Sequence, residues 1–299
     1  MKKLIFFAIA IVLVLSPVYS VKAENYNQET STTTCEQRFY GNLVTGDYKG
    51  KKDLYSVLYD YTGQTKVLTD KLDGNFSMGV FDDSGCHIYA TWTEPNSTKS
   101  DLVKLTMLND QVIFTKLVSY SYASEMYPDF WNDRVYYTRI STGGEPEIWY
   151  IDLTTWQEVR VVSGGWDSDI MMTPQGIELI TFKNKLGIRV QMLDGDFGYQ
   201  ISIPNLEVGD LHFGPDDKIY YILFEKIIVY DPNTGKNAYY LPGVSANYFD
   251  FSDAERNIWM GVVTPSNITR YLLVDYPELG VQHLDIPEDV IFSYVDWRW

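Results

Sequence analysis

The sequence predicts an all-β protein, and more narrowly a six-bladed β-propeller of four-stranded antiparallel blades. Two observations support this. The 299-residue chain has almost no stretch with apolar residues at helical spacing. It holds instead many short runs of Val, Ile, Tyr, Phe and Trp, interrupted by Gly, Pro, Asn and Asp. These runs also repeat about every 40 residues, which is typical of propeller blades.

The first repeated unit is an apolar strand that ends in Asp or Asn, often followed by a turn. Asp, Asn, Pro and Gly suit such turns because they hydrogen-bond the local backbone, fix φ or tolerate positive φ. The six copies end 37 to 49 residues apart and span residues 54–60, 102–109, 148–152, 188–194, 227–231 and 271–275.

The second repeated unit precedes the last five copies of the first. It is an apolar or aromatic residue followed by a tight polar turn and a strand. Its copies are residues 81–85, 130–133, 172–176, 213–217 and 251–255. The first blade lacks this unit, and the chain ends on an extra strand at residues 290–296. We therefore expect this last strand to be the innermost strand of the first blade, whose other strands come from about residues 38–70, and so to close the ring. A solenoid or a double sandwich is the alternative.

The N-terminus has the features of a secretory signal peptide. Lys2 and Lys3 precede an apolar run at residues 4–15, and a short polar stretch ends at Ala23. The run is shorter than the roughly 20 residues that a membrane span needs. We expect cleavage after Ala23, or after Ser20, and a secreted or periplasmic protein. An uncleaved membrane anchor is the alternative. Residues 24–37 are expected to form a flexible leader, and residues 38–299 the propeller domain.

Charge and cysteine content narrow the possible partners. Without the three lysines of residues 1–23, 21 basic residues face 40 acidic ones, a formal net charge of −19. This acidity excludes nucleic acid and anionic lipid as expected partners. The two cysteines, Cys35 and Cys86, form a disulfide or remain as two buried thiols; the sequence leaves both open. We expect a monomer that does not insert into membranes.

The turns resemble those of the TolB-like (WD40-like) six-bladed propeller family. That family repeats a Ser-Pro-Asp-Gly turn between the two inner strands, then a strand ending in Asp and a Thr-Gly turn. Residues 213–217 (FGPDD) and 230–235 (YDPNTG) resemble it best, and residues 143–152 resemble the middle of a blade. The likeness covers about residues 38–299, but no copy keeps the full turn motif. The resemblance implies an envelope or secreted propeller that binds other macromolecules.

The repeat places candidate site residues along the propeller channel. His212 precedes Phe213 as Asp129 precedes Phe130 and Asp250 precedes Phe251. Innermost strands line the channel, so Asp129, His212 and Asp250 are expected at one level of it. Two carboxylates and an imidazole there are able to hold a cation or exchange protons, with His212 as the candidate acid or base. The alternative is a hydrated polar channel without a ligand.

Loops that enter the inner strands form a second candidate site. Asp167, Asp169 and Asp210 are expected near the channel mouth, and Trp166 beside them as an exposed stacking platform for a sugar or peptide side chain. The metal candidates are Asp129, Asp210 and Asp250, and Ca²⁺ is the one candidate cofactor, because carboxylates are its preferred ligands. The alternative is solvated loop ends, with Trp166 packed between blades.

The sequence contains no standard catalytic motif, such as a Gly-x-Ser-x-Gly elbow, a zinc-binding His-Glu-x-x-His or a phosphate-binding glycine loop. The leading hypothesis is therefore an exported non-enzymatic propeller that binds a protein or glycan through its loop face. The alternative is a calcium-dependent extracellular lyase or hydrolase with its site at the channel mouth. A structural assembly protein is a third class.

Overall fold

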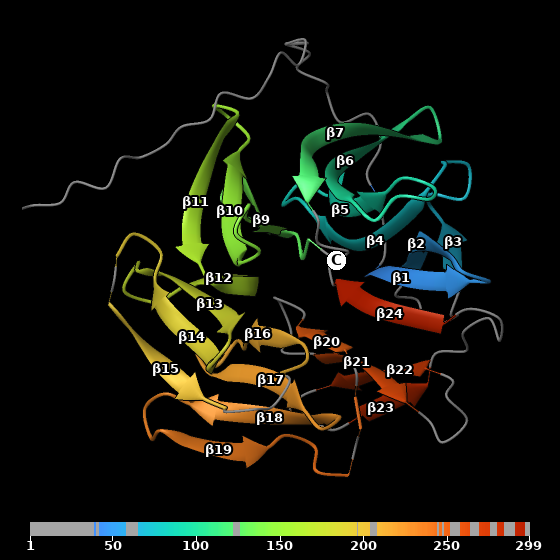
Figure 1. The fold of residues 1–299 in the computed structure, drawn as a ribbon. Helices are drawn as coiled ribbons and strands as arrows, with labels where there is room; N and C mark the ends of the chain where they lie inside the picture. Colours follow the sequence, from blue (N-terminus) through green and yellow to red (C-terminus); the bar gives the residue numbers. More distant parts are fainter. Residues whose placement is uncertain are drawn as a thin grey trace, which may run out of the picture.

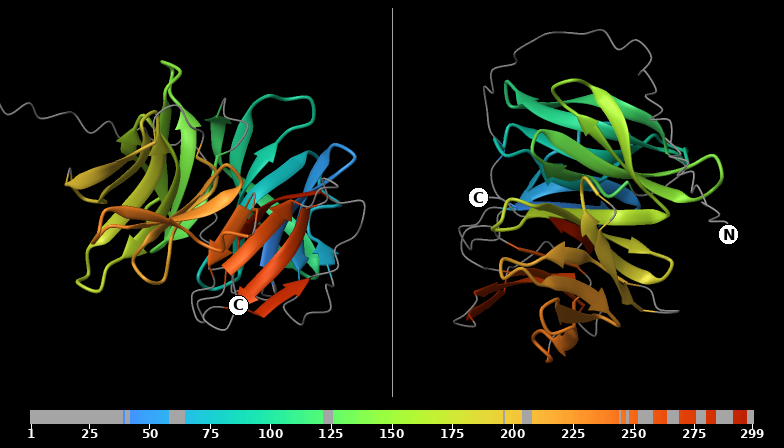
Figure 2. Two further views of the ribbon diagram at one scale, coloured as in Figure 1. Left: turned by 90° about the horizontal axis from the view of Figure 1, so that it is seen from below. Right: turned by 90° about the vertical axis from the view of Figure 1, so that its left-hand side faces the viewer.

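The computed structural model is an all-β ring of sheets around a central axis (Figure 1). It describes residue 39 and residues 42–57, 65–121, 126–195, 197–203, 208–243, 245–246 and 248–251. It also describes the backbone of residues 258–263, 269–275, 280–283 and 291–296. Figure 2 shows the sheets side by side around the axis in two further views. Within these ranges no helix is long and apolar enough to cross a membrane.

Five sheets are each built from four consecutive antiparallel strands. The first holds β4 (Asn75–Phe81), β5 (His87–Thr93), β6 (Ser100–Leu108) and β7 (Gln111–Ser121). The second holds β8 (Asp129–Trp131), β9 (Arg134–Ile140), β10 (Pro146–Asp152) and β11 (Gln157–Ser163). The third holds β12 (Gly165–Met172), β13 (Glu178–Asn184), β14 (Gly187–Met192) and β15 (Gly198–Ser202).

The fourth sheet holds β16 (Leu211–Phe213), β17 (Ile219–Leu223), β18 (Lys226–Asp231) and β19 (Lys236–Tyr239). The fifth holds β20 (Tyr248–Phe251), β21 (Ile258–Val263), β22 (Thr269–Asp275) and β23 (Gly280–His283). In each of the five sheets the first strand lies nearest the ring axis (Figure 1).

The expected count of six blades needs correction, because only five blades consist of consecutive strands. The remaining four-stranded sheet is composite and has the order β24-β1-β2-β3. It joins β1 (Asn42–Tyr48), β2 (Lys51–Val57) and β3 (Thr65–Val67) to β24 (Ile291–Asp296). β24 pairs antiparallel with β1, and the register shifts between Thr45 and Gly46. The side chains of β24 lie outside the described residues, so the packing that would close the ring at this seam is not described.

Both repeated sequence units have a clear structural counterpart. Each strand that was expected to end in Asp or Asn is the third strand of its sheet, namely β2, β6, β10, β14, β18 and β22. Each copy of the second unit, an apolar or aromatic residue followed by a turn, lies between the first and second strands of its sheet. The prediction of antiparallel four-stranded blades is therefore confirmed.

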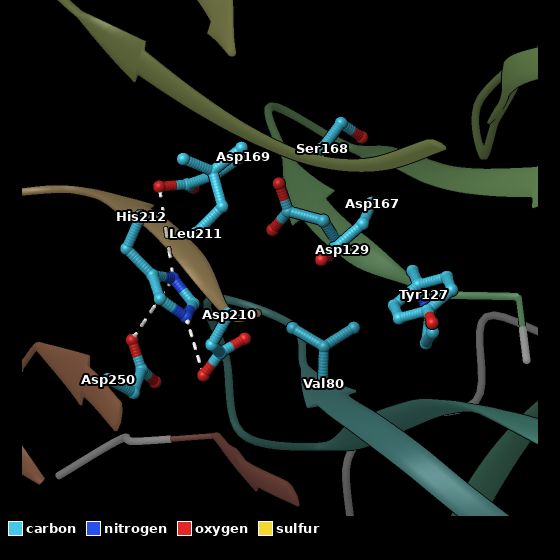
Figure 3. A pocket seen from close by; sticks show the side chains of 11 residues that line it. Val80, Tyr127, Asp129, Asp167, Ser168, Asp169, Asp210, Leu211, His212 and Asp250 are labelled. Carbon is cyan, nitrogen blue, oxygen red and sulfur yellow. Dashed lines mark ion pairs between the residues drawn. The ribbon is translucent and has the colours of Figure 1, made fainter. Parts of the chain in front are cut away.

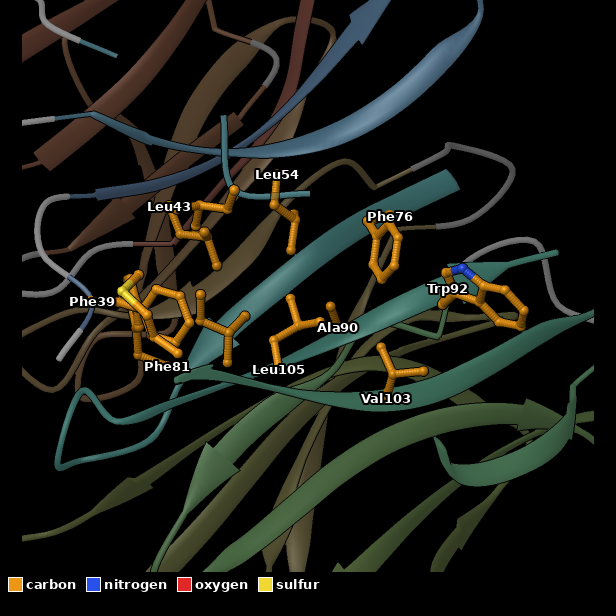
Figure 4. Packing of buried hydrophobic residues seen from close by; sticks show 12 residues of the cluster. Phe39, Leu43, Leu54, Phe76, Phe81, Ala90, Trp92, Val103 and Leu105 are labelled. Atoms are coloured by element: carbon orange, nitrogen blue, oxygen red, sulfur yellow. The ribbon is translucent and has the colours of Figure 1, made fainter. Parts of the chain in front are cut away.

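Apolar side chains pack mainly between neighbouring sheets. Leu43 and Leu54 of the composite sheet belong to one buried cluster with Phe76, Ile88 and Leu105 of the next sheet (Figure 4). Fully burying such a side chain stabilises the fold by roughly 1.5–3 kcal/mol. The pleat of each sheet presents alternate side chains to each neighbour, so the sheets hold one another around the axis.

Buried threonines tie the innermost strands to the preceding sheets. Thr45 Oγ1 accepts a hydrogen bond from the Met78 backbone N–H (2.9 Å), and Thr91 Oγ1 accepts one from the Met126 N–H (3.2 Å). Thr138 Oγ1 accepts the third, from the Asp167 N–H (3.1 Å). All three threonines are buried. These bonds satisfy amides in or just before the innermost strands that a regular ladder would leave unpaired.

Several expectations fall on the N-terminal residues. The signal peptide, the leader and Cys35 lie outside the described residues. Cys86 is buried and disulfide-bonded. Its pairing with Cys35 stays a prediction, because only one of the two partners is described.

Candidate functional site

A small polar cavity lies on the ring axis, where the innermost strands converge (Figure 3). The volume of the cavity is about 70 Å³, and a cavity needs about 10–15 Å³ to hold one water. The cavity therefore has room for a few waters or for the tip of one charged side chain. Five sheets contribute to its lining, which consists of Val80, Tyr127, Pro128, Asp129, Asp167, Ser168, Asp169, Asp210, Leu211, His212 and Asp250.

A bulge in β12 brings Asp167 and Asp169 to the cavity. The pairing of β12 with β13 shifts register between Trp166 and Ser168, and Asp167 has a φ of 52°. Aspartate tolerates this left-handed conformation better than most residues. Glycine is needed at position 165, where β12 begins, because a Cβ atom there would lie 2.5 Å from the Phe182 ring.

Asp167 forms an ion pair with Lys183 on the neighbouring strand β13. Both residues are buried, at 9% and 6% exposure. Burial raises the pKa of Asp167; the Lys183 ammonium opposes this rise and the Asp210 carboxylate adds to it. The Lys183 ammonium also lies 5.7 Å from the centre of the Tyr127 ring. The pair thus places the positive charge of Lys183 beside the acidic residues that line the cavity.

Backbone amides hold the other carboxylates. Asp169 Oδ2 accepts a hydrogen bond from the Phe213 N–H at 2.6 Å. Asp210 Oδ2 accepts one from the Phe249 N–H at 2.9 Å. Each of these bonds joins one sheet to the next. Asp129 and Asp250 instead accept bonds from the N–H groups of the residues that follow them, both at 2.7 Å. The aspartates are therefore fixed by the fold before any ligand arrives.

His212 lies among three of these carboxylates. Its Nε2 is 3.4 Å from Asp210 Oδ2, and its Nδ1 is 3.7 Å from Asp250 Oδ1 and 3.9 Å from Asp169 Oδ2. Dashed lines mark these contacts in Figure 3. Burial by itself would lower the pKa of His212, but Asp210, Asp250 and Asp169 outweigh it and raise this pKa well above its ordinary value. The three carboxylates therefore favour the protonated form of the imidazole.

The structure brings most of the sequence-derived candidates together. Asp129, Asp167, Asp169, Asp210, His212 and Asp250 all line the one cavity, so the channel group and the mouth group are a single cluster. Trp166 is half-buried and is not among the lining residues. The expected stacking platform beside the acids is therefore not part of this cavity.

Sequence reasoning missed Lys183 and Tyr127. Lys183 lies in the strand Glu178–Asn184, most of whose residues are buried, and a lysine in such a strand signals a buried partner. Tyr127 lies before β8, where no motif marks it. The expected calcium site finds no support in the distances: within the described part of the chain, no three Asp, Glu, His or Cys side chains are grouped so as to hold a metal ion.

Comparisons with known proteins identify the fold. No protein-family model and no curated protein sequence matches the chain. Among solved structures, TolB from Acinetobacter baumannii superposes with a TM-score of 0.62 at 15% identity, over 85% of this chain and 67% of that one. A protein from Agrobacterium tumefaciens assigned as a TolB gives 0.56 at 12% identity, over 85% of this chain and 98% of that one.

A puromycin-hydrolyzing peptidase from Mycobacterium tuberculosis is also similar. It gives a TM-score of 0.54 at 11% identity, over 84% of this chain, which spans only 46% of the peptidase. At these identities the comparisons establish the fold alone. The chain has the β-propeller fold that TolB proteins share, and the same architecture also occurs in enzymes, so fold does not decide function.

Proposed function

We propose that the chain is a non-enzymatic binding module that takes a positively charged group of a protein partner into its central cavity. The observation that carries this proposal is the charge of the lining. The five aspartates of the lining lie near two cationic side chains, Lys183 and His212. Together these seven groups have a formal excess of three negative charges when all are ionised. A cavity lined by charges of one sign attracts a ligand of the other.

The size and lining of the cavity favour a side chain over a sugar. Its open volume suits one ammonium or guanidinium group. Apart from the imidazole of His212, Tyr127 is the only aromatic side chain among the described residues that line it. Arginine presents five donors in a planar fork, which matches carboxylates that already stand in fixed positions. A glycan partner, the other half of the original expectation, would need a stacking surface that this cavity does not offer.

The described residues give less support to catalysis. Asp167 is paired with Lys183, and Asp169 and Asp210 are engaged by backbone amides of other sheets. These contacts suit a rigid receptor. The calcium-dependent lyase or hydrolase stays the alternative prediction, and the experiment below includes an arm for it. Export remains a prediction from residues 1–23.

The test uses acetylated, amidated pentapeptides that differ only at the central residue: Arg, Lys, Gln or Glu. Each is titrated into ¹⁵N-labelled protein and followed by NMR. The amides of Phe213, Phe249 and Phe251 serve as reporters, because they donate to Asp169, Asp210 and Asp250. We expect saturable shifts at these amides with the Arg and Lys peptides alone.

Two variants sharpen the result. Asp250→Asn should weaken binding of the Arg peptide, whereas Asp194→Asn, on an exposed turn, should not. If neither basic peptide shifts the reporter amides, the proposal is wrong. A final arm adds CaCl₂ after treatment with a chelator. Saturable shifts of the same amides with calcium, and none with peptide, would favour the calcium-dependent enzyme instead.

A further inference from the structure

The position of His212 has a consequence for any cation that enters the cavity. The three oxygens that face its ring, Asp169 Oδ2, Asp210 Oδ2 and Asp250 Oδ1, come from three sheets and already accept backbone N–H bonds. Nε2 is buried and, despite lying 3.4 Å from Asp210, makes no regular hydrogen bond with any described residue. The imidazolium therefore occupies this set of carboxylates by charge more than by fixed hydrogen bonds.

We propose that His212 and the incoming cation compete for these carboxylates, so that a cation enters fully only as the imidazole releases its proton to solvent. This inference rests on the proposed function and deepens it, because it makes binding at that site sensitive to pH. Two positive charges in one small buried cavity repel each other strongly, since water does not screen them as it does at a surface.

The charged groups around His212 support this competition. Asp169 and Asp167 face it from β12, Asp210 precedes it, Asp250 faces it from β20, and Asp129 lies across the cavity. Lys183 is the other cationic side chain described beside this cluster, and Asp167 pairs with it. Phe249 packs edge-on against the imidazole, with ring centres 5.0 Å apart, so the ring has an apolar support as well as charged neighbours. Of these two cationic groups, His212 is thus the one that loses its charge when a cation binds.

The linkage between proton release and cation binding determines how strongly, and in which direction, the affinity changes with pH. If one proton leaves for each cation bound, the affinity rises up to tenfold per pH unit while His212 is protonated in the free protein, and it levels off above that range. By reciprocity, the bound cation raises the acid dissociation constant of His212 by the same factor by which protonation weakens cation binding, and so lowers its pKa.

The test is isothermal titration calorimetry with the central-Arg pentapeptide between pH 6 and 9. The peptide is blocked at both ends and its guanidinium stays charged throughout, so it contributes no titration of its own. Each pH is run in phosphate and in Tris, whose different ionisation heats reveal the number of protons released. We expect up to one proton released per peptide and an affinity that rises with pH.

His212→Gln should bind with an affinity independent of pH and release no proton. His87→Gln is the matched control, because His87 lies in β5, outside the cavity lining, and should behave as wild type. NMR titration of the His212 ring in the unmutated protein provides a second readout, and its pKa should fall when the peptide is bound.

Each other result has a defined meaning. Binding without proton release, or release that persists in His212→Gln, would overturn the competition while leaving cation binding intact. Absence of binding at every pH would instead remove the proposed function, and the competition with it.

Discussion

The carboxylate of Asp210 accepts a hydrogen bond from the backbone N–H of Phe249, 2.9 Å away on the first strand of the next sheet. The same oxygen lies 3.4 Å from His212 Nε2. One atom thus serves the fold and the candidate site together. The consequences of this arrangement can be tested.

Replacing Asp210 with alanine should destabilise the protein by about 1–3 kcal/mol, because the Phe249 N–H would lose its acceptor. Asp210→Asn keeps an oxygen in place and should recover much of this loss. Urea unfolding followed by tryptophan fluorescence measures the difference. Asp194→Ala, on an exposed turn, is the control. Equal stability of the alanine variant and the wild type would show that the inter-sheet bond contributes nothing.

Removing one partner of the Asp167–Lys183 pair should cost more than removing both charges. Lys183→Met leaves a buried carboxylate without its counter-charge, a change that typically costs about 3–5 kcal/mol. Adding Asp167→Asn should restore part of that stability, since asparagine also tolerates the positive φ at this position. A double-mutant cycle in urea gives the coupling energy. Strictly additive effects of the two substitutions would contradict a direct pairing.

The stability that His212 contributes should depend on pH with a defined sign. Because the folded protein raises the pKa of His212 well above the ordinary 6.5, the folded state binds its proton more tightly than the unfolded state. This contribution is fully present below about pH 6.5 and disappears as pH rises through the folded pKa. Unfolding of wild type and His212→Gln between pH 6 and 10 should therefore give curves that converge at high pH. A gap that widens with pH would reverse the sign.

Thr138→Val should loosen the bulge that positions Asp167. The substitution keeps the shape of the side chain but removes the acceptor of the Asp167 N–H, so we expect a loss of about 1–3 kcal/mol. Thr138→Ser retains a hydroxyl and should lose less. Hydrogen exchange at the Asp167 amide is the specific readout: it should accelerate in the valine variant, and unchanged exchange would count against the bond.

The sequence predicted the strands and turns well because their signals are local. An Asp or Asn lies at the end of the third strand of each sheet or within three residues after it, and an apolar or aromatic residue precedes the turn between the first two strands of the five sheets of consecutive strands. Residues such as Asp231 and Phe213 therefore mark positions without reference to distant parts of the chain. The same register placed Asp129, His212 and Asp250 in one cavity.

Contacts across sheets were not predictable in this way. The bond from Asp169 to the Phe213 amide depends on how two sheets approach each other. The position of Lys183 beside Asp167 depends instead on the irregular pairing of β12 with β13 within one sheet. A bulge at Asp167 changed which side chains reach the axis, and Trp166 is not part of the cavity lining. Residue types alone do not reveal such a shift. An extra residue in a strand moves the side chains beyond it to the opposite face of the sheet.

The composite sheet has a consequence for how the protein is made. One edge of β1 pairs with β2, and the other pairs with β24, the last described strand. This second edge therefore has no partner until residues 291–296 have been synthesised. Contacts between such distant segments form slowly, because the cost of closing a long loop comes before the contact rewards it. Until then the nascent chain presents an open strand edge, and other chains are able to pair with it. Conditions that keep chains with an incomplete ring apart from one another should therefore favour correct folding during synthesis.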